Sequence, residues 1–212
     1  MLLVCHFMIN LRKNRLAQLF VIYTRYLIGG AFVFASIIKI KGERFTTVSG
    51  ADSPIDSAWH FFETMYASGL YWQFIGLGQL IAAFFLMTQR YARLGALLFL
   101  PIIGNIFVIT LSYDFRGTPI ITGLMLLANV MLVIWEWDEL KVIFNLEPKQ
   151  IISSNFETHR VWEVTGLAMF LFTVGYRVLF NAYNIFFWGG VCLLLGGSAL
   201  IWGWVKIPES KL

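Results

Sequence analysis

Six long apolar stretches constrain this chain more than any other feature of its sequence. They cover residues 16–40, 70–87, 91–112, 118–137, 161–180 and 185–205. A helix needs about 20 predominantly apolar residues to cross a hydrocarbon core about 30 Å thick, and each stretch approaches that length. The sequence therefore predicts an all-α fold, a polytopic transmembrane helical bundle with six spans.

Composition excludes most soluble functions. Charged residues make up 13% of the chain and hydrophobic residues 58%, whereas a soluble domain carries about 25% charged residues. The longest segment between spans, 41–69, is too short for a soluble catalytic domain. The sequence has no glycine-rich phosphate loop and no metal-spaced His and Cys cluster, and all its histidines lie outside the spans. We therefore predict no metal site and no bound cofactor, with quinone the one cofactor left open.

The net charge of +4 is explained by membrane topology, because Lys and Arg concentrate in cytoplasmic loops. If the N-terminus lies inside, the inner loops and termini carry more Lys and Arg residues than the outer ones. The sequence therefore predicts that both termini are cytoplasmic and that the protein has no nucleic-acid partner. Two translation starts, Met1 and Met8, remain open.

A polar segment divides the spans into two groups. The organisation is a cytoplasmic extension at 1–15, a four-span core at 16–146, a cytoplasmic linker at 147–160 and a two-span hairpin at 161–212. In the core, residues 54–67 are expected to form an outer amphipathic helix, because Ser53 can cap it and Pro54 suits its first position. Pro101 is expected to kink the third span.

Three segments resemble a known family. They read RYLIGGAFVFASIIKIKG, FFETMYASGLYWQFIGLGQLIAAFFLMTQRYARLGALLFLPIIGNIF and GLMLLANVMLVIWEW. Over about residues 23–144 the chain resembles the DoxX-like family of small bacterial integral membrane proteins. The resemblance implies a four-helix core in the bacterial cytoplasmic (inner) membrane. The family is named for a subunit associated with thiosulfate:quinone oxidoreduction, and other relatives are linked to redox or stress complexes, so quinone is a possible ligand.

The chain also departs from the pattern of that family. Gln79 stands where relatives commonly have an acidic residue, and Thr110 and Ser112 stand where many have a histidine. The spans at 161–180 and 185–205 are additional. The departures at Gln79 and Thr110 argue against a redox role for this chain.

Arg25 lies well inside the first predicted span. A charge there costs at least about 2.5–3.5 kcal/mol on insertion scales, so its side chain is expected to face protein or water and to have a partner. The candidate partners are Tyr23, Tyr26, Gln73, Gln79 and Asn105. One interpretation is a site for an anion, a quinone or a lipid head group. The other is a structural Arg25 that binds backbone carbonyls freed by Pro101.

Several other polar residues are candidates for a site. An outer set could bind a small anion or relay protons, with His60 titrating near neutral pH, or it could be an ordinary solvated rim. The set consists of Lys39, His60, Glu63, Asp114 and Arg116. Gln79, Asn105 and Asn129 are expected to form hydrogen bonds between helices. The ligand-binding candidates are thus Arg25, Lys39, His60, Glu63, Gln79, Asn105 and Asp114.

Three functions fit these observations. The leading hypothesis is an accessory subunit of a membrane complex, redox-linked, with quinone or lipid binding. The alternatives are a small-solute or anion carrier that uses Arg25 and a quinone-dependent oxidoreductase subunit. The expected partners are the lipid bilayer and either other membrane subunits or further copies of the chain. No catalytic residue is identified, and whether the protein is an enzyme stays open.

Overall fold

The computed structural model describes residues 11–46, 48–113, 115–147, 156–182 and 184–208, and within these residues the fold is all-helical. The elements are α2 (Arg15–Ile40), α3 (Ala58–Ala67), α4 (Leu70–Met87), α5 (Ala92–Ser112), α6 (Thr118–Trp135), α7 (Trp137–Leu140), the 3-10 helix η1 (Lys141–Phe144), α8 (Arg160–Leu179) and α9 (Ile185–Lys206). The all-α prediction is confirmed.

Side-chain caps explain where several helices begin. The Asn14 side chain accepts a hydrogen bond from the amide of Leu16 at 2.8 Å and caps α2. The side chain of Asn184 does the same for α9. The outer helix begins later than predicted, because Ser57 rather than Ser53 caps α3, and the amide of Ser57 bonds the Pro54 carbonyl in a preceding turn. Polar caps satisfy amides that have no partner within the helix.

Five helices are long and apolar enough to cross a membrane, namely α2, α4, α5, α6 and α9. They correspond to five of the six predicted spans. The remaining stretch forms α8, a helix of 20 residues with Glu163 in its first turn and Arg177 in its last, and it is not among the five. The long apolar helices indicate a membrane location.

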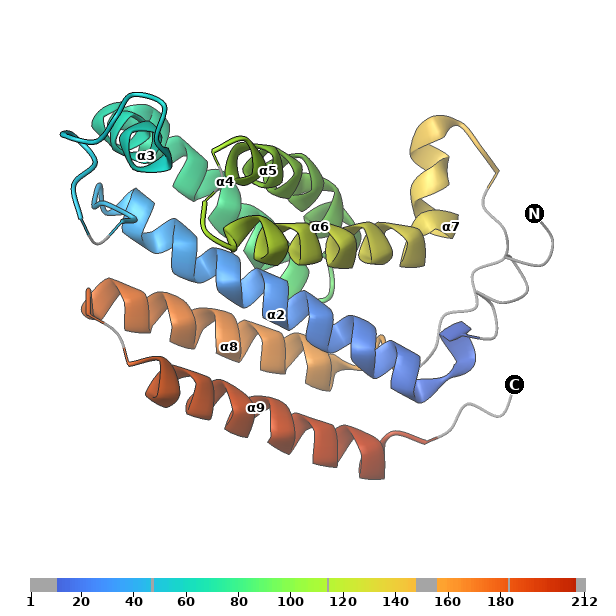
Figure 1. Ribbon diagram of the computed structural model, residues 1–212. Coiled ribbons are helices and arrows are strands. Elements are labelled where there is room, and N and C mark those ends of the chain that lie inside the picture. Colours follow the sequence, from blue (N-terminus) through green and yellow to red (C-terminus); the bar gives the residue numbers. More distant parts are fainter. Residues whose placement is uncertain (1–10, 47, 114, 148–155, 183, 209–212) are drawn as a thin grey trace.

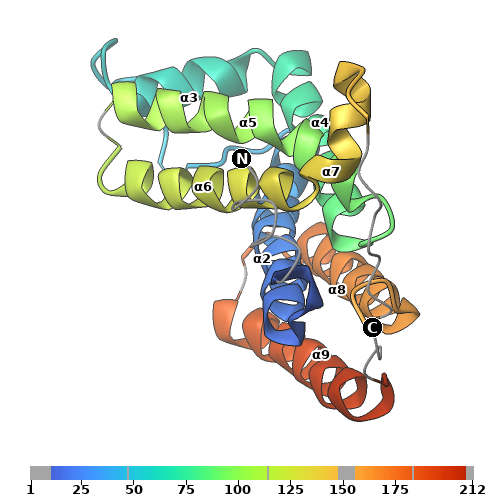
Figure 2. The same cartoon turned by 90° about the vertical axis from the view of Figure 1, so that its right-hand side faces the viewer.

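Helix α2 lies at the centre of the structure. It packs along α4 on one side and α8 on the other, while α5 packs between α4 and α6, and α9 packs against α8 (Figure 1). In Figure 2, α2 runs towards the viewer while α5 and α6 run across the view, so these two helices are inclined to α2. The core includes the side chains of Ile22, Val33, Phe99 and Leu132.

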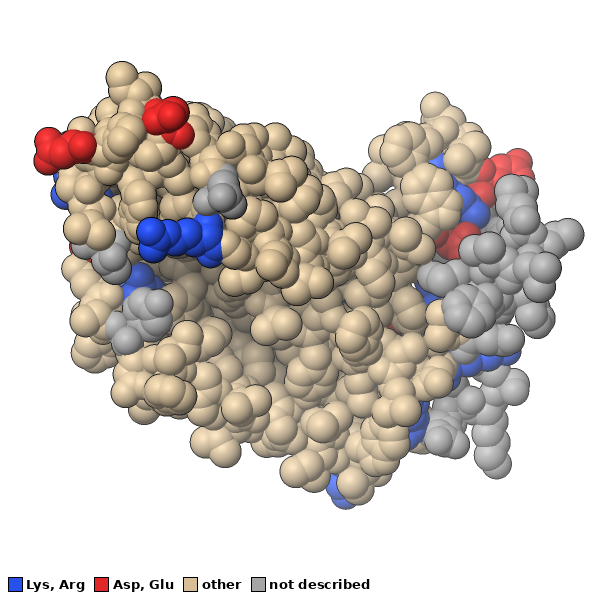
Figure 3. All heavy atoms as spheres, viewed as in Figure 1, with Lys and Arg blue, Asp and Glu red and all other residues tan. Residues whose placement is uncertain are grey.

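The two ends of the helices differ in their surroundings. At the α3 end lie α3, the C-terminus of α2 and the turn between α5 and α6, whereas at the α7 end lie α7, the N-terminus of α2 and the α4–α5 turn (Figure 1). On the face shown in Figure 3, Lys, Arg, Asp and Glu side chains gather mainly at these ends. The surface between them is largely uncharged, as expected for helices in lipid.

Glycine permits α8 to approach the core closely. A Cβ atom built on Gly166 would lie 1.7 Å from the carbonyl oxygen of Met87 at the end of α4. Beside this contact, the hydroxyl of Tyr26 donates to the carbonyl of Trp162, whose side chain is fully buried. Small residues at such contacts are typical of helix association in membranes, where packing rather than the hydrophobic effect drives association.

This contact predicts that Gly166→Ala destabilises the protein. The added methyl group meets backbone rather than a movable side chain, so we expect a loss of about 1–3 kcal/mol, as for overpacked cores. Gly175→Ala, in the same helix but with no atom within 4 Å of its Cβ position, is the control and should be neutral. Thermal unfolding in mild detergent measures both, and equal midpoints would contradict the packing described here.

Candidate functional site

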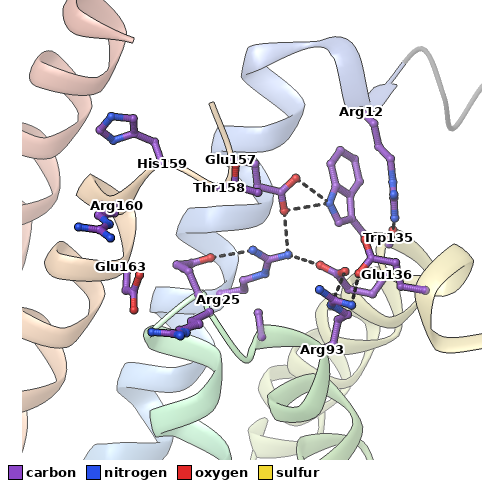
Figure 4. Close-up of a pocket in the computed structure, with 14 residues that line it drawn as sticks. Arg12, Arg25, Arg93, Trp135, Glu136, Glu157, Thr158, His159, Arg160 and Glu163 are labelled. Carbon is purple, nitrogen blue, oxygen red and sulfur yellow. Dashed lines mark hydrogen bonds and ion pairs between the residues drawn. The ribbon is translucent and has the colours of Figure 1, made fainter. Parts of the chain in front are cut away.

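Arg25 is the centre of a buried ion cluster at the α7 end (Figure 4). Its side chain is only 3% exposed. One terminal nitrogen donates to Gln89 Oε1 at 2.7 Å, and the other donates both to Glu157 Oε1 at 2.9 Å and to Glu136 Oε1. We call Arg25, Gln89, Glu136 and Glu157 the Arg25 cluster.

The observed partners differ from those predicted for Arg25. The terminal nitrogens of its guanidinium donate to Gln89, Glu136 and Glu157, and none of the five predicted side chains is among these acceptors. The acceptors also include no backbone carbonyl near Pro101, so the structural interpretation based on that kink is wrong. Arg25 is ten residues into its own helix, but it lies level with the α4–α5 turn and the end of α6. Its charge therefore meets the termini of neighbouring helices rather than their middles.

Neighbouring side chains also contact the two carboxylates of the cluster. Trp135 Nε1 donates to Glu157 at 3.2 and 3.3 Å. Arg93 Nε lies 3.8 Å from Glu136 Oε2, and the guanidinium of Arg12 donates to the Trp135 carbonyl. The described end of the predicted linker is thus packed into the fold, because Glu157 belongs to this cluster.

Electrostatics set the protonation of Glu136. Burial raises the pKa of this carboxyl above its usual range, and the neighbouring Arg25 guanidinium partly opposes that rise. A cavity of about 430 Å³ borders the cluster, and it is lined mainly by charged side chains. Because both terminal nitrogens of Arg25 already donate to oxygen atoms, the cluster joins separate parts of the chain rather than offering Arg25 to an outside anion.

A second cavity, of about 580 Å³, lies among α2, α4, α5 and α6 towards the α3 end. Its walls are almost entirely apolar, and three aromatic side chains, Phe45, Phe62 and Phe115, line it near that end. Three of the predicted candidates also line it, namely Lys39, Gln79 and Asn105. We call this space the Lys39 cavity. Its volume falls within the range of about 300–1,000 Å³ that is common for ligand pockets.

Lys39 is buried in this cavity without a counter-charge among the described residues. Its side chain is 6% exposed, and its ammonium donates to the Ala35 carbonyl at 2.7 Å. It lies 4.7 Å from the ring centroid of Phe45 and 5.1 Å from that of Trp72. Such cation–π contacts are worth roughly 0.5–2 kcal/mol each, which offsets only part of the cost of burying an ammonium.

Gln79 shares the wall of the cavity with Lys39. Its side chain is 2% exposed, and its Oε1 atom has no hydrogen-bond partner among the described residues. A Cβ on Gly76, one turn away on α4, would lie 2.8 Å from Lys39 Cβ, so α2 and α4 touch beside these side chains. The expected hydrogen bond between helices is confirmed for Asn129, which donates to Ala96 O at 3.1 Å.

The described members of the predicted outer set have separate surroundings and share no hydrogen bond or ion pair with one another. Glu63 pairs with Arg44 at 2.7 Å and accepts from the amide of Gly50 at 3.0 Å, and the Arg44 guanidinium lowers the pKa of Glu63 to about 2. His60 lies on α3 with a buried Nδ1 that has no partner in the described part of the chain. Arg116 is exposed, and Asp114 lies outside the described residues.

Glu136 and Glu157 are not among the partners that the sequence predicts for Arg25. A signal was present, because Glu136 directly follows Trp135 at the end of an apolar stretch. An acidic residue at a span end is a natural partner for a basic residue in a neighbouring span. The sequence contains no comparable signal for Glu157.

Comparison with known proteins gives a partial match. No protein-family model matches the sequence, and no solved structure matches it significantly. A segment of 75 residues is 40% identical to an uncharacterized protein, YwoB, of Bacillus subtilis strain 168. The match covers 35% of this chain and 47% of that protein, so the chain spans about half the length of this relative. The similarity assigns no activity.

The Arg25 cluster predicts that Arg25→Gln strongly destabilises the protein. Removing one partner of a buried ion pair leaves an uncompensated charge, which typically costs about 3–5 kcal/mol. Adding Glu136→Gln to this variant should recover part of the loss. Denaturant unfolding in mild detergent measures the coupling between the two residues, and additive losses would contradict the cluster as described.

The same variant has a predictable pH dependence. Without Arg25, the pKa of Glu136 in the folded state rises further above its ordinary value of 4.5. A raised carboxyl pKa favours the folded state at low pH, and this contribution is lost as pH rises. Arg25→Gln should therefore lose stability relative to the double variant as pH rises above the ordinary carboxyl pKa of 4.5.

Proposed function

We propose that this protein is a multi-pass membrane protein that binds a lipid-like molecule in the Lys39 cavity. The observation that carries the proposal is an apolar cavity of about 580 Å³ with a buried ammonium and an unpartnered carboxamide oxygen in its wall. Ligand pockets have this character, with mostly apolar walls and a few polar groups that fix orientation. Quinones and lipids both belong to the class of ligand that such walls accept.

The membrane setting supports this proposal. We place all six predicted spans in a helical bundle in the bacterial cytoplasmic membrane, with both termini in the cytoplasm. Helix α8 is the sixth span in this proposal, because it lies between α2 and α9, and its Glu163 and Arg177 sit at its two ends. Arg177 is buried and donates to the carbonyls of Phe180 and Asn181 at the end of α8, and Glu163 is half-buried at the other end.

The Arg25 cluster argues against the hypothesis of an anion carrier that uses Arg25. A carrier that uses Arg25 needs free hydrogen-bond donors on its guanidinium, whereas the terminal nitrogens already donate to Gln89, Glu136 and Glu157. The roles of accessory subunit and oxidoreductase subunit, like the resemblance to the DoxX-like family, stay predictions. Each is compatible with a membrane protein that holds a lipid-like molecule.

Filling the cavity tests the proposal. Gly78 lines the Lys39 cavity, and no atom lies within 4 Å of its Cβ position, so Gly78→Leu should occupy the cavity without displacing backbone. Gly104→Leu is a matched control, because Gly104 also has free space around its Cβ position but does not line the cavity.

The measurement is native mass spectrometry of protein purified from its own membrane in mild detergent. We expect wild type and Gly104→Leu to retain an apolar molecule that Gly78→Leu loses, with all three proteins monodisperse. Absence of any bound molecule from wild type, or its retention by Gly78→Leu, would overturn the proposal.

A further inference from the structure

We infer that the Lys39 cavity selects single-chain amphiphiles with one anionic head group, such as a long-chain carboxylate, and that Lys39 pairs with that head. The inference rests on the proposed function and adds the chemical class of the ligand. It starts from the contrast between two of the buried cations, Arg25 and Lys39. Arg25 has two carboxylates, whereas the Lys39 ammonium has no acidic oxygen within 4 Å in the described part of the chain.

A buried charge is stable only when it is paired and hydrogen-bonded. The ammonium of Lys39 has three donors, and the Ala35 carbonyl accepts one hydrogen bond from it. The rings of Phe45 and Trp72 supply attraction but no negative charge. An anionic oxygen in the cavity beside Lys39 would complete this environment, whereas a neutral head group would leave the charge uncompensated.

The walls of the cavity limit the head group and place the chain. Phe45, Phe62 and Phe115 line the cavity at the α3 end, and their rings offer no hydrogen bonds to a large polar head. The wall also includes Ala31, eight residues before Lys39 on α2, and eight residues of helix span about 12 Å. An apolar chain can therefore extend from Lys39 along α2.

Gln79 supplies a second polar contact for the head. It lies one turn along α4 from Gly76, which touches Lys39, and its carboxamide oxygen is buried and unpartnered. Because a carboxamide can turn to present its NH₂ group, Gln79 can donate to one oxygen of a carboxylate while Lys39 pairs with the other. One ammonium and one carboxamide suit a small head with a single negative charge.

The test compares oleate with oleyl alcohol, which has the same chain and a neutral head. Competition against radiolabelled oleate on the full chain in lipid nanodiscs measures both affinities. Wild type should bind oleate at least about tenfold more tightly than oleyl alcohol, a difference of about 1.4 kcal/mol. Lys39→Met should abolish this preference while retaining the affinity for oleyl alcohol, and Lys39→Arg should keep the preference.

Two further variants separate the possible failures. Gly78→Leu should weaken both ligands, because it fills the cavity. Asp114→Asn should leave the preference unchanged, since the inference assigns the counter-charge of Lys39 to the ligand; a rise in oleate affinity in this variant would overturn it. Lys39→Gln provides a second neutral variant should Lys39→Met not fold.

Equal affinities in wild type, or a preference that survives both neutral variants, would overturn the anionic head group while leaving the proposed cavity intact. Failure of both amphiphiles to bind wild type, or binding that Gly78→Leu does not weaken, would overturn the proposed function and the inference with it.

Discussion

The guanidinium of Arg25 is shared by two carboxylates that come from distant parts of the chain. Glu136 ends α6, and Glu157 precedes α8, so one buried side chain joins α2 to both. Burying such charges is expensive unless each is paired with good geometry, and the cluster therefore restricts where α8 can begin. From that point α8 runs along α2, with Gly166 against the end of α4. The packing of the central helices thus depends on this interaction.

At the α3 end, by contrast, the buried cation is not paired with a carboxylate of the described residues. There the Lys39 ammonium is enclosed by aromatic rings and a carbonyl, and the described residues supply no carboxylate to it. The inclination of α5 and α6 to α2 (Figure 2) accompanies a cavity in which Lys39 and Gln79 share a wall. One end of the fold pairs the buried Arg25 with carboxylates, whereas at the other end the Lys39 ammonium has no carboxylate and Gln79 Oε1 has no hydrogen-bond partner among the described residues.

Glycine residues occur both at the close contacts between helices and in the wall of the Lys39 cavity, and the role of each depends on its position. Gly76 and Gly166 stand where two helices touch, so a Cβ atom would collide with the neighbouring helix. Gly78 is only two residues from Gly76, yet it borders open space in the Lys39 cavity. In a membrane, where apolar side chains face apolar lipid, such differences in close packing decide which helix faces meet.

The sequence was enough to predict the all-α fold and the position of five apolar helices, because length and hydropathy are local properties of a chain in lipid. It also singled out Arg25, Lys39 and Gln79, since polar side chains in apolar stretches are costly wherever they lie. Their partners depend on how the helices pack together in the folded protein. The way in which neighbouring helices are shifted along their axes brings Glu136 and Glu157 to Arg25 and places Lys39 beside a cavity. The positions of the helices along their axes depend on packing between helices, and the hydropathy of the sequence carries no information about that packing.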